Sequence, residues 1–369
     1  MDILTEEILI ERFDQLVSEG VIIYGPHDTI PIEARGYPLT LRICPALATK
    51  PHTIGASNPA FHHARKWGPG SDLFCPDERL ILTTLNGTHD LALNLFCVKR
   101  PQLLLPTTNS WKRQHEALDM DDMAVILETM RLFPSIYMLY NCGEDGGCSR
   151  VHKHLQGLPG PPHAFNHIVN SLTQNPRNSS FSPGIPFAIL SHDFSSSSPS
   201  PHLLYTAYTA LLARASALLN RPWDPVVAPP HNVVVWRGWL FVVPRRRGSL
   251  RGASANAGGM MGEVWVHGRE AVEIWGEDGR GYRALVTRVK NIKSKPESGS
   301  PRNAPQVGKV DRRLKATINR YQTLEADFRR DSQAAAERQY RIVRPDATDA
   351  EVREAVADPD APIFQQAVW

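Results

Sequence analysis

One stretch of the chain combines residue types that can do chemistry with a regular spacing. Residues 141–156 read NCGEDGGCSRVHKHLQ, so His152, His154 and Gln156 follow a glycine-rich loop at intervals of two. Alternate residues of a strand share a face, so we expect these three side chains to point the same way. Glycine has no Cβ, so the backbone amides of such a loop can approach phosphate oxygens closely. The loop glycines are Gly143, Gly146 and Gly147.

This arrangement favours nucleophilic chemistry at phosphorus. A neutral imidazole nitrogen attacks a phosphoryl centre without first losing a proton, and the covalent intermediate then passes the group to an acceptor. The other ring nitrogen has to be held, commonly by a backbone carbonyl. Gln156 can hold a phosphate oxygen without adding negative charge. Two other interpretations stay open from the residues alone, since two nearby histidines can also bind a metal ion or have no chemical role.

The surrounding segments predict an α+β protein built on an antiparallel sheet. A helix is expected between Thr5, which can cap it, and Gly20, which can end it. Helical spacing of apolar residues predicts two more helices, over 119–132 and 202–219. The segments 176–200 and 244–262 are rich in Ser, Pro, Gly and Arg and are expected to be loops. Short apolar runs predict strands over 39–44, 80–85, 91–96, 102–105, 136–140, 152–158, 232–236, 239–243 and 263–267.

Charge divides the chain into two unlike parts. Of the last 80 residues 27 are charged, against 52 of the first 289, and all five cysteines lie in the first part. The join is rich in Lys, Ser and Pro, which is typical of a solvated linker. We therefore expect a domain over 1–289, a flexible linker over 290–308 and a helical appendage over 309–369.

The composition excludes several classes of function. A net charge of +3 over 369 residues gives no electrostatic case for binding nucleic acid. No apolar run reaches the roughly 18 residues of a membrane helix, so no membrane span is expected. Five cysteines without a C-x-x-C pair do not favour a disulfide framework or a structural zinc site. The acidic first residues do not form a secretory signal, and a cytoplasmic protein is expected.

The glycine-rich stretch also resembles a known family. The pattern N-x-G…G-x-S-x-x-H-K-H-x-Q is similar to that of the fungal-type ATP adenylyltransferases, also called diadenosine tetraphosphate phosphorylases, of the histidine triad superfamily. Other segments match in the same order, and the resemblance covers about 1–285. These segments are Pro45–Pro51, His89–Leu105, Asn232–Arg245 and Asn256–Gly262.

The resemblance implies a fold, a reaction and a set of site residues. The fold is a histidine-triad-like antiparallel sheet with flanking helices. The reaction is phosphorolysis by a nucleotidyltransferase, in which diadenosine tetraphosphate and phosphate give ATP and ADP through an adenylyl group on His154. His152 would shape the site and Gln156 would bind the α-phosphate. The residues implied to hold phosphates and nucleotide are Lys50, Asn94, Asn141, Gly143, Gly147, Ser149, Asn232, Arg245 and Asn256. The covalent step requires no metal or other cofactor, although nucleotides usually arrive with Mg²⁺.

Some positions depart from the family pattern. Gly146 stands where Ser is frequent, and Leu95 stands where Lys is frequent, which removes one phosphate contact and one charge. The acidic residues Glu144 and Asp145 would repel phosphate unless they point outward. These departures keep open a nucleotide-binding protein that forms no adenylyl group. Transfer of a nucleotide sugar, as in the related uridylyltransferases, is disfavoured. Those enzymes have His-Pro-His where this chain has Lys153 between the histidines, and their cysteine metal site is not found here.

The tail carries a different resemblance. Apolar residues from Val310 to Phe328 recur at intervals of three and four, which predicts a helix that a helical partner can bind. A second helix is expected over 349–357. Residues from about 309 to 369 resemble fungal plasma-membrane syntaxins, up to the beginning of their SNARE helix. The sustained heptads and the anchor of that family are not found there, so a trafficking role is an alternative with less support.

Overall fold

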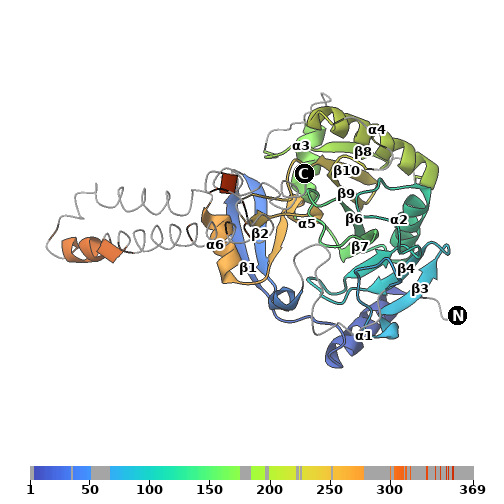
Figure 1. Ribbon diagram of the computed structural model, residues 1–369, viewed down its shortest axis with the longest axis horizontal. Coiled ribbons are helices and arrows are strands. Elements are labelled where there is room, and N and C mark those ends of the chain that lie inside the picture. Colours follow the sequence, from blue (N-terminus) through green and yellow to red (C-terminus); the bar gives the residue numbers. More distant parts are fainter. Residues whose placement is uncertain are drawn as a thin grey trace. The chain divides into compact units, whose positions relative to one another are not determined.

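The computed structural model describes most of the first 277 residues and scattered positions after them (Figure 1). The described residues are 4–34, 36–50, 67–174, 184–195, 199–221, 224, 227–250, 252–277, 300, 303–310 and scattered positions between 312 and 352. Contacts divide the chain into one compact unit that ends at Trp275 and a second that begins at Gly276. The expected tail helices fall mostly outside the described residues, and so does the expected linker, except for residue 300 and residues 303–308.

The first unit contains the sheets and the helices that flank them. Its helices are α1 (Glu6–Ser18), α2 (Met120–Leu132), α3 (Phe165–Gln174), α4 (Pro201–Leu219), α5 (Ala257–Met260) and α6 (Arg269–Glu277), with 3₁₀ turns at Pro45–Thr49 and Glu78–Leu80. Its strands are β1 (Asp28–Ala34), β2 (Tyr37–Ile43), β3 (Ile81–Leu85), β4 (His89–Leu93), β5 (Leu103–Pro106), β6 (Ile136–Cys142), β7 (His154–Pro159), β8 (Leu190–Asp193), β9 (His231–Trp236), β10 (Trp239–Pro244), β11 (Ser249–Leu250), β12 (Ala253–Ser254) and β13 (Glu263–Val266).

Eight strands form one sheet in the order β3-β4-β5-β7-β6-β9-β10-β8, and every neighbouring pair is antiparallel. β7 pairs with β5 on one side and with β6 on the other. Gln156, for example, lies opposite Leu104 and Leu139. A strand paired on both sides cannot slip by one residue without reversing every side chain, so its register is strongly specified. The expected α+β fold with a large antiparallel sheet is confirmed.

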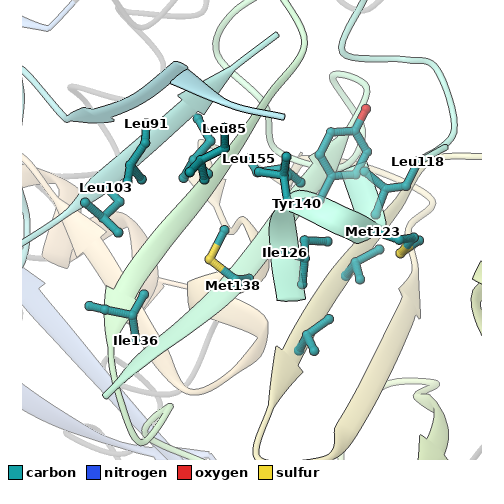
Figure 2. Close-up of a cluster of buried hydrophobic side chains, with 14 of the residues drawn as sticks. Leu85, Leu91, Leu103, Leu118, Met123, Ile126, Ile136, Met138, Tyr140 and Leu155 are labelled. Atoms are coloured by element: carbon teal, nitrogen blue, oxygen red, sulfur yellow. The ribbon is translucent and has the colours of Figure 1, made fainter. Parts of the chain in front are cut away.

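One face of this sheet is buried against helices. α2 lies against β6, and α4 lies along β8 and β10 (Figure 1). Figure 2 shows Leu103, Met138 and Leu155 of the sheet packed with Met123 and Ile126 of α2. Burying each such side chain contributes roughly 1.5–3 kcal/mol, so this layer holds the central strands in place.

The other face of the sheet packs on α3 and α5, and a smaller sheet completes the unit. Its order is β1-β2-β13, with β13 parallel to β2. Val264 and Val266 of β13 pack with Leu41 and Ile43 of β2, and α6 covers them through Trp275. This small sheet forms the far wall of the cavity described below.

Most expected elements are present, and the elements that were not expected are β1, α3 and α6 together with several shorter pieces. Thr5 caps α1, accepting a hydrogen bond from the Ile8 amide at 3.3 Å, and both other expected helices are found as α2 and α4. The segment expected to be a loop before 200 contains β8, which pairs only with β10. The segment after 244 contains β11, β12 and α5. These pieces are too short to show a hydrophobic period.

A buried charge fixes the start of β7 to the helix layer. Lys153, with 1% of its surface exposed, places Nζ 2.7 Å from Oδ2 of Asp122 and 2.8 Å from the Ala117 carbonyl. The other Asp122 oxygen lies 3.0 Å from His89 Nε2 on β4. A network of this kind is favourable only when every member is paired. Lys153 therefore faces the helices, while the next residue, His154, faces the opposite side of the sheet.

We expect Lys153→Met to lower the free energy of unfolding by about 3–5 kcal/mol, because it leaves the Asp122 charge buried without its cation. The matched control is Lys112→Met, which breaks a partly exposed ion pair with Asp119 and should cost at most about 1 kcal/mol. Urea unfolding followed by circular dichroism measures both. Equal losses in the two variants would contradict a special role for the buried network.

Candidate active site

A cavity of about 480 Å³ opens between the large sheet and the small sheet. Leu103 and Leu105 of β5 face the helix layer, whereas Leu104 between them faces the cavity. The cavity therefore lies on the face of the sheet away from α2. The residues expected at the site that line it are Lys50, Asn94, Asn141, Gly147, Ser149, His154, Gln156 and Asn256.

His154 is held with one ring nitrogen bound and the other left for a substrate. Its Nδ1 lies 2.8 Å from the His152 carbonyl, and its main-chain N–H donates to Oε1 of Gln114 at 2.7 Å. A carbonyl only accepts, so Nδ1 carries the proton and Nε2 keeps its lone pair. Among the residues that the structure describes, none hydrogen-bonds to Nε2.

The surroundings of His154 keep its ring neutral. The residue is 5% exposed, and burial lowers the pKa of its imidazole to about 4, helped by the nearby charge of Lys50 and opposed by the hydrogen bond to the His152 carbonyl. A neutral imidazole with a free lone pair is the form that attacks phosphorus. The ring therefore has the form that an attack on phosphorus requires at physiological pH.

The His152 side chain does not share the face of His154. The expectation that it points the same way as His154 and Gln156 was wrong. β7 begins only at His154, and Asp72 accepts the backbone N–H groups of Val151 and His152 at 2.9 and 3.1 Å. The His152 ring is fully buried, between the Ser71 hydroxyl at 2.8 Å and the Thr107 carbonyl at 2.9 Å. Its clamped backbone supplies the carbonyl that orients His154.

The loop glycines do not offer their amides to a ligand, contrary to expectation. The N–H groups of Gly143, Gly146 and Gly147 donate to the carbonyls of Gln114, Gly143 and Glu144 at 2.9, 3.0 and 2.8 Å. Of the three glycines only Gly147 lines the cavity. These three amides are therefore engaged by carbonyls, and donors to a phosphate have to come from other groups of the cavity wall.

Asn232 and Arg245, expected to line the same cleft, lie behind it instead. The Asn232 amide donates to Oδ1 of Asn141 at 2.9 Å and to the Gly146 carbonyl at 2.6 Å, and its own oxygen accepts from Arg245 Nη1 at 2.6 Å. The Ala257 amide also donates to Oδ1 of Asn141 at 2.7 Å. Oδ1 of Asn141 thus accepts two hydrogen bonds, one from Asn232 and one from Ala257. These bonds orient the amide so that its Nδ2 donor faces the cavity.

Three other amides in the cavity wall are also oriented by their neighbours. Gln102 donates to Oε1 of Gln156 at 3.1 Å, which leaves the Gln156 N–H groups for a ligand oxygen. Asn94 donates one of its two Nδ2 N–H groups to the Phe96 carbonyl at 2.9 Å, which fixes the plane of its amide. Asn256 caps α5 by accepting from Gly259 at 3.2 Å.

The charge of the cavity wall is positive. Lys50 and Arg150 line the wall, and no Asp or Glu is among its described residues. Neither Glu144 nor Asp145 lines the cavity, and Asp145 lies 3.6 Å from Arg221. Burial, with the charge of Arg150, lowers the pKa of Lys50 to about 8. Sequence analysis did not include Arg150 among the expected site residues. Its position between Ser149 and the histidines is the signal in the sequence that could have pointed to it.

The wall formed by the small sheet and α6 is mainly apolar and aromatic. It contributes Trp265 and Val266 of β13 and Ile274 and Trp275 of α6. Leu95, one of the departures from the family pattern, lies in the wall and is buried. At the other departure, a Cβ on Gly146 would collide with the backbone of Cys142. Serine therefore does not fit at position 146 without a shift of the loop.

No helix among the described residues has the length and apolarity to cross a membrane. Within the same residues, no three His, Cys, Asp or Glu side chains gather in a way that could hold a metal ion. That nucleotides arrive with Mg²⁺ stays a prediction.

Two family models match the chain over most of the first unit. The Ap4A phosphorylase N-terminal domain, where Ap4A is diadenosine tetraphosphate, matches residues 22–170, and the ATP adenylyltransferase C-terminal domain matches residues 183–289. Diadenosine 5′,5‴-P1,P4-tetraphosphate phosphorylase 2 of Saccharomyces cerevisiae is 28% identical over 234 residues, which are 55% of this chain and 70% of that protein. The chain belongs to the Ap4A phosphorylase and ATP adenylyltransferase family. The expected enzyme class is thereby confirmed.

Solved structures of an Ap4A phosphorylase share the fold. The crystal structure of yeast Ap4A phosphorylase Apa2 with Ap4A has a TM-score of 0.56 at 22% identity, and that of Apa2 alone has a TM-score of 0.57 at 23% identity. Each covers 74% of this chain and 92% of Apa2. The likeness confirms the histidine-triad-like fold.

A second curated relative is of another kind. An 85-residue stretch is 33% identical to protein transport protein SSO2 of Candida albicans, covering 23% of this chain and 29% of that protein. This match is in keeping with the second resemblance of the sequence. A partner for the tail stays a prediction.

We expect Gly147→Ala to weaken nucleotide binding about tenfold in this Ap4A phosphorylase family member, since inserting a methyl group into a packed site costs about 1–3 kcal/mol. Gly147 has a φ of +82°, and a Cβ there would lie 2.7 Å from the Ala255 carbonyl in the cavity wall. The matched control is Gly143→Ala, with a φ of +72° but nothing within 4 Å of the new Cβ. Quenching of tryptophan fluorescence by ADP measures both, and equal affinities would show that the wall tolerates the methyl group.

Proposed function

We propose that this enzyme cleaves Ap4A with phosphate to ATP and ADP, through an adenylyl group carried on Nε2 of His154. The observation that supports this most directly is the neutral imidazole in a cation-lined cavity, with Nδ1 hydrogen-bonded to the His152 carbonyl at 2.8 Å. Family membership supports the reaction class, and the name of the yeast relative supports the substrate.

The first step forms one bond and breaks one bond. The lone pair of Nε2 attacks the α-phosphorus at one end of Ap4A, and the bond from that phosphorus to the bridging oxygen of the next phosphate breaks. ATP leaves with the bonding electrons. The ring gains positive charge as the bond forms, and the hydrogen bond from Nδ1–H to the His152 carbonyl stabilises that charge. No proton has to move, because the attacking nitrogen has none.

The second step transfers the adenylyl group from His154 to phosphate. An oxygen of orthophosphate attacks the same phosphorus, the bond to Nε2 breaks, and ADP is released with the imidazole neutral again. The N–H groups of Gln156 and Asn141 hold the non-bridging oxygens of the transferred phosphoryl group in both steps, a role supported by their position in the cavity wall and by the hydrogen bonds to their amide oxygens. Neutral donors suit this position, because they stabilise developing charge without binding either reactant too tightly.

The first prediction from this mechanism concerns the covalent intermediate. We expect the protein, mixed with Ap4A in the absence of phosphate, to gain the mass of one adenylyl group, and His154→Ala to gain none. Intact-mass spectrometry measures the adduct, and added phosphate should remove it with release of ADP.

The control for that experiment is His163→Ala, which changes a histidine outside the residues that line the cavity and should leave the adduct unaffected. If Ap4A binds tightly and no adduct forms, the chain is a nucleotide-binding protein and the proposed reaction fails.

The second prediction concerns pH. The imidazole of His154, with a pKa of about 4, should stay neutral, so the rate of adenylylation should not fall between about pH 7.5 and 5.5. The rate should fall above about pH 8, where Lys50 loses its proton. Lys50→Arg should remove this alkaline decline, because a guanidinium stays charged. Single-turnover assays without phosphate measure the profile. A decline centred near the ordinary histidine pKa, about 6.5, would show that the nucleophile is not desolvated.

A further inference from the structure

The ladder between β6 and β7 is interrupted beside the nucleophile, and Gln114 lies at the interruption. The pairing of the two strands ends where Leu139 lies opposite Gln156. Two residues further along the same register, Asn141 of β6 would lie opposite His154 of β7. The ladder ends before that pair, although both residues belong to their strands. The main-chain groups at this point therefore need other partners.

The side-chain amide of Gln114 takes the place of the missing ladder bonds. Its Oε1 accepts the His154 N–H at 2.7 Å, and its Nε2 donates to the carbonyls of His154 and Asn141 at 3.1 and 3.0 Å. A primary amide has two N–H groups and one carbonyl, so all of its polar groups are in use. Gln114 is 2% exposed, and no water competes for these bonds. One buried amide thus joins the backbones of the two residues.

The main chain of Gln114 is fixed to the same two parts of the sheet. Its N–H donates to the Val151 carbonyl at 2.9 Å, just before β7 begins. Its carbonyl accepts the Gly143 N–H at 2.9 Å and the Tyr140 hydroxyl at 2.9 Å, at the end of β6. Gln114 therefore joins β6 to β7 through its backbone as well as through its side chain, and its amide has little freedom to move.

We propose that Gln114 is a positioning residue for adenylyl transfer, and that it sets the spacing between Nε2 of His154 and the amide of Asn141. The proposal rests on the proposed function, since that function places both groups at the phosphorus under attack. Gln114 is not among the residues that line the cavity, so it acts through these two residues and does not touch the substrate.

The spacing matters because a phosphoryl group has to fit between the two side chains. Opposite residues of an unbroken antiparallel ladder keep their Cα atoms only about 4.5–5.5 Å apart. The amide inserted between the strands holds His154 and Asn141 further apart and keeps them in one fixed relation. An attacking atom has to lie about 3–3.5 Å from its target, and a misplacement of about 1 Å can cost about 100-fold in rate.

The first test separates the rate of the chemical step from ground-state binding. We expect Gln114→Met, which keeps the length of the side chain and removes its hydrogen bonds, to slow adenylylation by Ap4A about 100-fold in single-turnover assays without phosphate. The affinity for AMP should change less than about threefold, because bound AMP forms no bond to Nε2 of His154. Gln114→Asn, which keeps the amide but is one methylene shorter, should show the same division and serves if Gln114→Met does not fold.

The second test requires no turnover. Adenosine together with vanadate imitates the phosphorus under attack, because vanadium accepts five ligands and can bind Nε2 of His154 as one of them. We expect both Gln114 variants to weaken binding of adenosine with vanadate about 100-fold relative to the wild-type protein, while AMP binding changes little. Isothermal titration calorimetry of the full chain measures both ligands.

The matched control is Tyr208→Phe, which removes another buried polar group outside the residues that line the cavity. The Tyr208 hydroxyl accepts the Leu118 N–H at 3.1 Å and lies 3.0 Å from His231 Nε2. Its loss should lower the melting temperature but leave the adenylylation rate and both affinities unchanged.

Two results would overturn the proposal. Equal losses for AMP and for adenosine with vanadate would mean that Gln114 only supports the fold, and an unchanged rate and unchanged affinities would mean that the spacing does not depend on it. If the wild-type protein forms no adduct with Ap4A, the proposed reaction fails, and the comparison of the two ligands still decides whether Gln114 sets the spacing.

Discussion

The hydrogen bond between the His154 ring and the His152 carbonyl sets the chemistry of the cavity. It holds the proton on Nδ1 and so leaves a lone pair on Nε2. That carbonyl can orient a ring only if its own backbone is rigid. Ser71, Thr107 and Asp72 provide this rigidity by binding the His152 ring and main chain. The residue expected to stand beside the nucleophile therefore works through its backbone, while its side chain is fixed in the interior.

The three residues of the His-Lys-His run belong to three different environments. His152 is locked in a buried polar pocket, Lys153 reaches Asp122 in the helix layer, and His154 faces the cavity. β7 begins at His154, and its place between β5 and β6 fixes the register from that residue on. Asp72 and Asp122 hold the two residues before it. The buried ion network of Lys153 thereby helps to set the direction of its neighbour, His154.

Electrostatics and desolvation act together in this cavity. Burial removes water from the imidazole and from both cations, which keeps His154 neutral and makes each cation more responsive to an anion. The three glycine amides of the loop are bonded to carbonyls, so other groups of the cavity wall remain to bind a phosphate, among them the side chains of Lys50, Asn141 and Gln156.

The sequence by itself determined the family, the α+β class, the nucleophile candidate and most of the elements, because these depend on local pattern. Periodicity identified α2 and α4, and the spacing of His154 and Gln156 placed both on the cavity face. Only the tertiary structure showed that Asn232 and Arg245 lie behind the wall and orient Asn141. It also showed that the glycine amides are already bonded and that Arg150 is buried beside Lys50. The physical reason is that hydrogen-bond partners and desolvation depend on which distant segments meet, and no spacing along one segment contains that information.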